Sequence, residues 1–339
     1  MSRRSRRSKR KLNSLFMMVL LTGMLLLSST YAWFSANKEV ELNGINAKVV
    51  AAEGLQISLD GETWSSKITL NSTTLGNAAD NNYTWPDALV PVSTTGTTSS
   101  GNMDMLYGNV SADGTELNGV GQEVDSTTTK YIVFDLYFKN SSSRTGEGTD
   151  VDVLQLNNGT SVAINATDGK TGTGLENCVR SAVVLYGGKE SMTAEGSTIR
   201  AIAAGTPKVC IWEPNYNKHI NEVVNNDSRI SDASTVFTTI GLLPAASGTV
   251  SDIKSATVPE NSTTLALQKT LQTDAKLTVA TEMSNLGGSD KLTLAPNSVM
   301  KARVYIWLEG QDPDCIDTAS TGKSIDIVLG FTKPEVSKP

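Results

Sequence analysis

The segment Tyr131–Lys139, YIVFDLYFK, gives the clearest indication of the fold. Apolar residues recur along it with a period of two, as in a β-strand that has one face on a core. The other face is expected to carry Val133, Asp135, Tyr137 and Lys139. The face that we expect to be buried consists of Ile132, Phe134, Leu136 and Phe138.

The same alternation recurs on both sides of this segment. It predicts strands at Cys178–Tyr186, Lys208–Glu213, Met300–Leu308 and Ser324–Phe331. Turn residues predict two hairpins, one over 55–70 around Asp60-Gly61 and one over 151–166 around Asn157-Asn158-Gly159. The chain is also rich in Thr, Ser, Asn and Gly, which favours short strands joined by turns over helices.

These features predict an all-β protein, an antiparallel β-sandwich with long polar loop insertions and one or two short helices. The insertions are expected at 97–128, as an exposed segment, and at 215–262, with a short helix near Lys218–Val224. Residues 84–96 contain two prolines, which favours an edge segment or a packed loop over a central strand.

The first 32 residues have the organisation of a secretory signal peptide. Seven Lys and Arg residues precede a largely apolar run of thirteen residues, Leu15–Leu27, and small polar residues follow. The run is shorter than the roughly 20 residues that span a bilayer as a helix. Small residues at Thr30 and Ala32 place the cleavage between Ala32 and Trp33. An uncleaved membrane anchor is the alternative, because apolar character continues in part to Phe34.

The sequence around this junction, STYAWFSANKEVELNGI, resembles the start of the camelysin/TasA family of Gram-positive surface and biofilm-matrix proteins. The resemblance implies a jelly-roll sandwich, cleavage by a dedicated signal peptidase, and secretion to the cell surface or the extracellular matrix. It also implies that the mature N-terminal segment is a donor strand, which fills a groove in the next subunit of a fibre. The residues expected to act in this way are Trp33, Phe34, Val40, Leu42 and Ile45.

The expected organisation is a signal peptide at 1–32, a donor segment at 33–50, a sandwich domain at 51–331 and a polar tail at 332–339. The donor segment has an alternative interpretation, in which it folds back as the first strand of its own sheet. Burial of Trp33 and Phe34 is favourable in either case, by roughly 2–3 kcal/mol for each side chain.

The charge of the chain limits its partners. The whole chain carries −6, and its first 32 residues carry +7 without any acid, which leaves −13 for the mature protein. Such a chain repels phosphate backbones, which argues against a nucleic-acid partner. The expected partners are further copies of the chain and the signal peptidase. Membrane contact is expected only through the uncleaved leader.

The segment Ile306–Asp317, IWLEGQDPDCID, places three carboxylates in one loop. It resembles a C-terminal segment of secreted proteins that have the same kind of leader. Crowded carboxylates attract Ca²⁺, although the spacing here is not that of an EF-hand. A calcium site and a solvated acidic turn both remain open, and no other cofactor is expected. The candidate ligands are Asp312, Asp314 and Asp317.

The sequence argues against an enzyme, although camelysin itself is known as a surface protease. His219 is the only histidine, whereas zinc hydrolases use two or three. A Ser-His-Asp triad would have to recruit His219, and no Gly-x-Ser-x-Gly motif supports it. We therefore expect His219 to be an ordinary surface residue in a polar loop.

The three cysteines, Cys178, Cys210 and Cys315, permit one disulfide after export, and its pairing is open. Small buried thiols in strands are the alternative. Two functions remain for the mature chain. One is a structural subunit that polymerises through its N-terminal segment. The other is a monomeric adhesin or glycan-binding module, with Trp64, Trp85 and Trp307 as the contact residues.

Overall fold

The computed structural model describes residues 44–52, 54–110, 117–122, 130–141, 152–157, 159–165, 173–226, 230–235, 292–310, 312–315 and 324–333. Strands dominate these residues, and the helices among them are short. The prediction of an all-β fold is confirmed.

Two five-stranded sheets form the body of the fold. We call the first the central sheet, and its order is β12 (Lys208–Trp212), β11 (Val179–Ser191), β14 (Ser298–Leu308), β7 (Ile132–Asn140) and β2 (Leu55–Ser58). We call the second the terminal-strand sheet, and its order is β10 (Ser161–Ile164), β15 (Ser324–Thr332), β1 (Gly44–Ala51) and β3 (Lys67–Leu70), with β9 (Gln155–Leu156) beside the end of β15.

The main apolar core lies between these two sheets. Phe134 and Phe138 of β7 are fully buried in it, as the alternation in YIVFDLYFK predicts. Phe331 of β15 meets Phe138 edge to face, with 5.1 Å between the ring centroids. Aromatic pairs prefer this geometry. The two sheets are therefore held together by this specific ring contact as well as by the burial of apolar surface between them.

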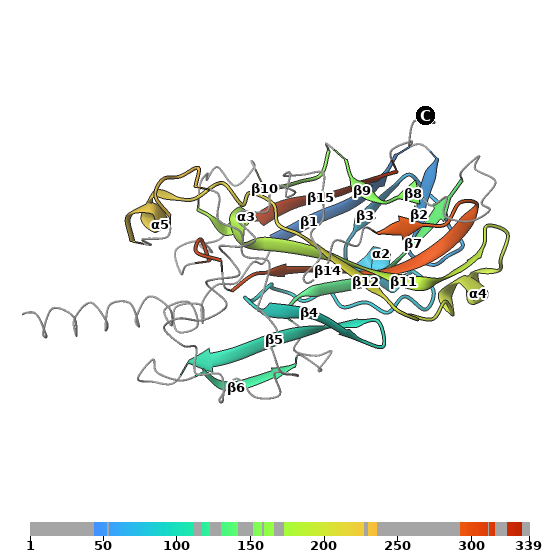
Figure 1. Ribbon diagram of the computed structural model, residues 1–339, viewed down its shortest axis with the longest axis horizontal. Coiled ribbons are helices and arrows are strands. Elements are labelled where there is room, and N and C mark those ends of the chain that lie inside the picture. The colour runs from blue at the N-terminus through green and yellow to red at the C-terminus, as the bar shows by residue number, and fades with distance from the viewer. Residues whose placement is uncertain are drawn as a thin grey trace, which may run out of the picture.

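A third sheet covers the other face of the central sheet (Figure 1). We call it the hairpin sheet, and it consists of β4 (Ser93–Ser99), β5 (Asn102–Val110) and β6 (Leu117–Gln122). Met103 and Met105 are buried in a second cluster with Tyr305 and Trp307 of β14. As a result, every residue of β14 is buried.

The prediction that 97–128 is an exposed insertion is therefore wrong for Met103 and Met105, whereas Ser99, Ser100 and Asn102 are exposed. Ser100 and Gly101 have φ angles of 51° and 80°, and they join β4 to β5. Two successive left-handed residues suit the tight turn of a two-residue hairpin. In the sequence, this hairpin was indicated by the Ser-Gly pair at 100–101 and by Met103 and Met105, whose spacing of two is that of one face of a strand.

The strands of both predicted hairpins pair mainly with other strands instead of with each other. Ile57 bridges Ser65 near the Asp60-Gly61 turn, but β2 then joins the central sheet and β3 joins the terminal-strand sheet. The second hairpin is wrong, because β9 and β10 both pair with β15 instead of with each other. Between them, Asn157 N donates to Gly330 O over 2.9 Å.

The first and last described strands, β1 and β15, pair with each other. These strands run parallel, from Gly44 opposite Ser324 to Ala51 opposite Phe331. All the other strand ladders in the described ranges are antiparallel, so the antiparallel prediction fails at this pair. The jelly-roll connectivity stays a prediction.

The remaining elements are small. A two-stranded sheet pairs β8 (Asp152–Val153) with β13 (Thr293–Leu294). The helix predicted near 218–224 is present as α5 (Asn221–Asn226). One or two short helices were expected, and the described ranges contain three besides α5: α2 (Ser72–Gly76), α3 (Leu175–Cys178) and α4 (Gly196–Arg200). Strand β11 passes Gly187-Gly188 through an irregular step instead of ending there. Most of the 215–262 insertion and of the 332–339 tail lies outside the described residues.

Candidate functional site

The acidic loop after β14 folds back onto α3 and the start of β11. The amide of Glu309 donates to the carbonyl of Cys178 over 2.7 Å. Gly174, at φ 85°, lets the loop come close, since a Cβ there would lie 3.2 Å from Cβ of Asp314. The loop thereby brings its acids to Arg180 and His219. We call the resulting group the charge cluster: Arg180, Glu213, His219, Glu309, Asp312 and Asp314.

Arg180 is the fully buried centre of the charge cluster. Its guanidinium lies 2.6 Å from Glu213 and 2.5 Å from Asp312, and it also donates to the carbonyls of Asn177 and Val179. Burial alone would lower the pKa of Arg180, but the nearby carboxylates raise it above its ordinary value. The buried cation is therefore held by two ion pairs and two backbone carbonyls. This role of Arg180 was not predicted, although a lone arginine in the largely apolar sequence of β11 is unusual.

His219 and Asp314 form a second pair in the same cluster. Nδ1 of His219 lies 2.7 Å from Oδ2 of Asp314, and Nε2 lies 2.9 Å from the carbonyl oxygen of Thr235. Burial would lower the pKa of His219, but the hydrogen bond and charge of Asp314 raise it. Burial raises the pKa of Asp314, and the charge of Asp312 adds to this. Both ring nitrogens face acceptors, which favours the doubly protonated imidazolium.

This geometry corrects the prediction that His219 is a surface residue, since only 8% of it is exposed. It also bears on catalysis. A histidine base needs a free nitrogen that faces the reacting group. In this pair, Nε2 is occupied by a backbone carbonyl and Nδ1 by a carboxylate.

The predicted calcium ligands are engaged with protein cations. Asp312 accepts from Arg180, and Asp314 accepts from His219 and from the amide of Ile220. A divalent cation at these oxygens would meet the buried charge of Arg180. Within the described ranges, no three His, Cys, Asp or Glu side chains are arranged to hold a metal ion. Asp317 lies outside the described residues. The alternative of a solvated acidic turn is wrong for Asp312 and Asp314, because both are buried.

The three cysteines are buried free thiols. Burial raises the pKa of Cys178 well above its ordinary value, and the hydrogen-bonded thiol of Cys315 raises it further. Cys178 therefore lies beside Cys315, at the end of α3 and not in the predicted strand. Cys210 lies in β12 and belongs to the same apolar cluster.

A second buried polar group lies between the central sheet and the hairpin sheet. We call it the Asp135 cluster, and its charged members are Asp135, Lys301 and Arg303. Asp135 is 2.9 Å from Nζ of Lys301 and 2.8 Å from Nε of Arg303. The ring of Tyr137 lies beneath Lys301, and burial raises the pKa of Tyr305 to about 12. Arg303 also reaches Asn102 of the hairpin sheet.

The predicted donor segment is described only from Gly44 onward. Ile45 lies in β1, half-buried against the main core, so residues 44–50 belong to a strand of their own sheet. Four of the predicted donor residues, Trp33, Phe34, Val40 and Leu42, lie outside the described residues, as does the cleavage position at Ala32.

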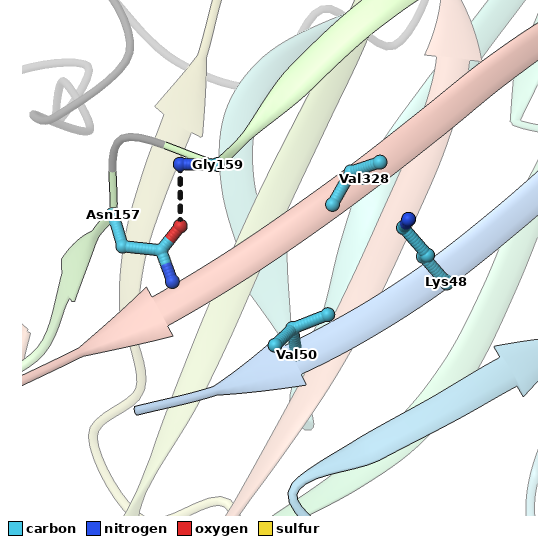
Figure 2. A pocket seen from close by; sticks show the side chains of 5 residues that line it. All are labelled: Lys48, Val50, Asn157, Gly159 and Val328. Carbon is cyan, nitrogen blue, oxygen red and sulfur yellow. Dashed lines mark hydrogen bonds between the residues drawn. The ribbon is translucent and has the colours of Figure 1, made fainter. Parts of the chain in front are cut away.

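The outer face of the terminal-strand sheet carries a shallow hollow of about 530 Å³ beside β1. Figure 2 shows Lys48 and Val50 of β1 and Val328 of β15 along it, with Asn157 and Gly159 at its rim. Asn157 is fixed there by a 2.8 Å hydrogen bond from the amide of Gly159. The hollow occurs where the edge strand is interrupted between β9 and β10.

The three tryptophans proposed for sugar contact have different surroundings. Trp307 is fully buried and donates to Glu309 over 3.1 Å, so it cannot stack on a ligand from solvent. Trp64 is half-buried beneath Lys139, with 4.2 Å from Nζ to the ring centroid. Trp85 is half-buried against the main core.

Comparison with protein-family models, with curated proteins and with solved structures finds no match to this chain. The resemblance at the mature N-terminus therefore stays a prediction. Among the residues that the structure describes, no helix has the length and apolar character needed to cross a membrane.

Proposed function

We propose that this chain is a secreted structural subunit, which builds fibres at the cell surface or in the extracellular matrix. In this proposal, the mature N-terminal segment of one copy, Trp33–Asn43, docks on the next copy. The observation that supports it most directly is the parallel pairing of β1 with β15.

The parallel pairing separates the two ends of the domain. The chain enters β1 at Gly44, beside Ser324, and leaves β15 after Thr332, beyond Ala51. A strand of eight residues spans about 26 Å. In this proposal, the segment before Gly44 extends from that end of the strand to the next copy. Contacts of this head-to-tail kind form open filaments when the rotation between copies does not close.

We place the receiving surface at the hollow beside β1. Val50 and Val328 supply apolar side chains on the outward face of the sheet, where their neighbours Asn46 and Asp326 form a hydrogen bond of 2.9 Å. An incoming segment that begins with Trp33 and Phe34 would find apolar contact there. Asn157 and Gly159 line the hollow at its rim, so polar groups lie beside the apolar contact surface.

The buried polar groups support a structural role over catalysis. Arg180, Asp312, His219 and Asp314 are paired with one another, and His219 shows no nitrogen free for proton transfer. Their geometry stabilises the end of the central sheet.

The test compares the mature chain from Trp33 with a truncated chain from Gly44. The truncation stops at Gly44 because a start near Ala51 would remove β1 from the middle of its sheet. We expect filaments of the mature chain by electron microscopy and light scattering, and monomers of the truncated chain. Val328→Arg should block polymerisation, whereas Thr69→Arg, an exposed change on β3 of the same sheet, should not.

Two results would contradict the proposal. One is a mature chain that stays monomeric at all protein, salt and calcium concentrations tested. The other is a truncated chain that still polymerises. If the mature monomer instead shows a change in tryptophan fluorescence with cell-wall polysaccharides, the adhesin alternative gains support, with Trp64 and Trp85 as its remaining contact residues.

A further inference from the structure

Three side chains from separate parts of the chain meet at one end of the fold: Asn140, Asp152 and Lys333. Asn140 is the last residue of β7 and is 1% exposed, and Asp152 begins β8 and is 4% exposed. Lys333 follows β15, and 11% of its side chain is exposed. An amide, a carboxylate and an amine are thereby brought together with little water.

The contacts of the three side chains converge on a single oxygen. Nδ2 of Asn140 donates to Oδ2 of Asp152 over 2.8 Å, and Nζ of Lys333 lies 3.9 Å from the same Oδ2. Nζ also donates to the carbonyl of Ser141, the residue after Asn140, over 3.0 Å. The lysine amine is therefore bound to the backbone carbonyl that follows Asn140, and it lies close to the carboxylate that binds the Asn140 amide.

The orientation of the Asn140 amide is determined by its partners. Nδ2 donates to Asp152 and to the carbonyl of Ala295, and both of these groups are acceptors. Oδ1 is buried, and it has no hydrogen-bond partner among the described residues. A buried carbonyl oxygen of this kind is unusual in proteins.

The backbone makes room for the lysine stem. Gly54, at φ 76°, lies under Lys333, and a Cβ there would be 3.0 Å from Cε and 3.2 Å from Nζ. The amide of Ser141 donates to the carbonyl of Gly54 over 3.0 Å, which fixes this glycine next to Asn140. The lysine thus follows a defined path between the ends of the two sheets.

We propose that Lys333 and Asn140 form an intramolecular isopeptide bond, with Asp152 as the acid and base. Asp152 first takes a proton from the Lys333 ammonium, and the free amine attacks Cγ of Asn140. The bond from Nζ to Cγ forms, and the bond from Cγ to Nδ2 breaks. Two protons pass from Nζ to the leaving nitrogen, which departs as ammonium. The reaction needs no oxidant and no further reactant.

The product would join the two main sheets covalently. Asn140 belongs to β7 of the central sheet, and Lys333 follows β15 of the terminal-strand sheet. The inference does not depend on polymerisation, because all three side chains belong to one copy of the chain.

The test is the intact mass of the full chain, purified after folding, together with a peptide map. We expect a mass lower than that of the sequence by one ammonia, and a branched peptide that contains both Asn140 and Lys333. Lys333→Arg and Asp152→Asn should restore the full mass with a native circular dichroism spectrum. Asn140→Asp should still form the bond but lose one water instead. Lys48→Arg is the matched control and should keep the loss of ammonia.

Two results would overturn the inference. One is a natively folded chain that retains its full mass after prolonged incubation. The other is a loss of ammonia that persists in Lys333→Arg, since this would indicate cyclisation of an asparagine with its own backbone.

Discussion

The two faces of the central sheet are both buried, but by different means. The face toward the terminal-strand sheet is covered by apolar side chains such as Phe134, Phe138 and Val304. The face toward the hairpin sheet contains Asp135, Lys301 and Arg303 among tyrosines and methionines. Volume and shape determine the packing of the first face. The second face depends on matched charges, because a buried charge that loses its partner costs several kcal/mol.

The largest effect on stability is expected when Asp135 is replaced, because Lys301 and Arg303 both pair with its carboxylate. Asp135→Leu would leave Lys301 and Arg303 buried without their carboxylate, at a cost of about 3–5 kcal/mol in unfolding free energy. The matched control is Phe134→Leu, the preceding residue on the apolar face, which should cost less than about 1.5 kcal/mol. Urea unfolding of both variants measures the difference. Equal losses would remove the distinction between the two faces.

A second change tests whether the hairpin sheet is a part of the cooperative fold. Met105→Ala should lower the unfolding free energy by about 2–5 kcal/mol, because Met105 is almost fully buried under the central sheet. Met300→Ala, on the opposite face of β14, is the control with the same chemistry. If only the Met300 variant loses stability, the hairpin sheet contributes little to the fold.

The charge cluster predicts how stability depends on pH. The folded pair of His219 and Asp314 has raised pKa values, so it binds its proton more tightly than the unfolded chain does. The stabilisation by His219 is fully present below about pH 6.5 and is lost as the pH rises through the folded pKa of the histidine.

His219→Ala should therefore cost about 1.5–3 kcal/mol below about pH 6.5 and less above it. Unfolding curves on both sides of this pH measure the effect, and Lys218→Ala serves as the control at an exposed neighbour. A loss that is the same at every pH would show that only packing is involved.

The smallest effect on stability is expected for Lys139, at the border of the face that is covered by the hairpin sheet. Nζ of Lys139 lies over the ring of Trp64, and a contact of this type at a partly exposed site is worth about 0.5–1 kcal/mol. Lys139→Gln should lower the unfolding free energy by that amount, whereas Lys139→Arg should retain most of it. Thermal unfolding of the two variants checks this, and identical losses would rule out the ring contact.

The comparison also shows what the sequence could predict. The alternation in 131–139 and in the last two long strands predicts which side chains face the main core. It does not reveal that the opposite face is covered as well, because Asp135, Lys139 and Arg303 have the composition of a solvent-exposed face. The first covering strand, β4, is also difficult to predict, since 93–101 consists of Thr, Ser and Gly, which usually form loops.

The other contacts that the sequence did not predict join residues far apart in the chain. The partners in the β1 and β15 ladder, such as Asn46 and Asp326, are 280 positions apart, so no local pattern encodes their contact. The same holds for the charge cluster, where Arg180 meets Asp312 across 132 positions. The acidic loop was recognisable as an unusual segment, but its partners were not.

The position of β1 has a mechanical consequence. β1 is hydrogen-bonded on both sides, to β15 over its whole length and to β3 over part of it. A pull on the chain before Gly44 acts along the strand, so tension would be shared by both ladders at once instead of opening them bond by bond. A tether that is anchored in this way resists extension by shear, which suits a link in a chain under load.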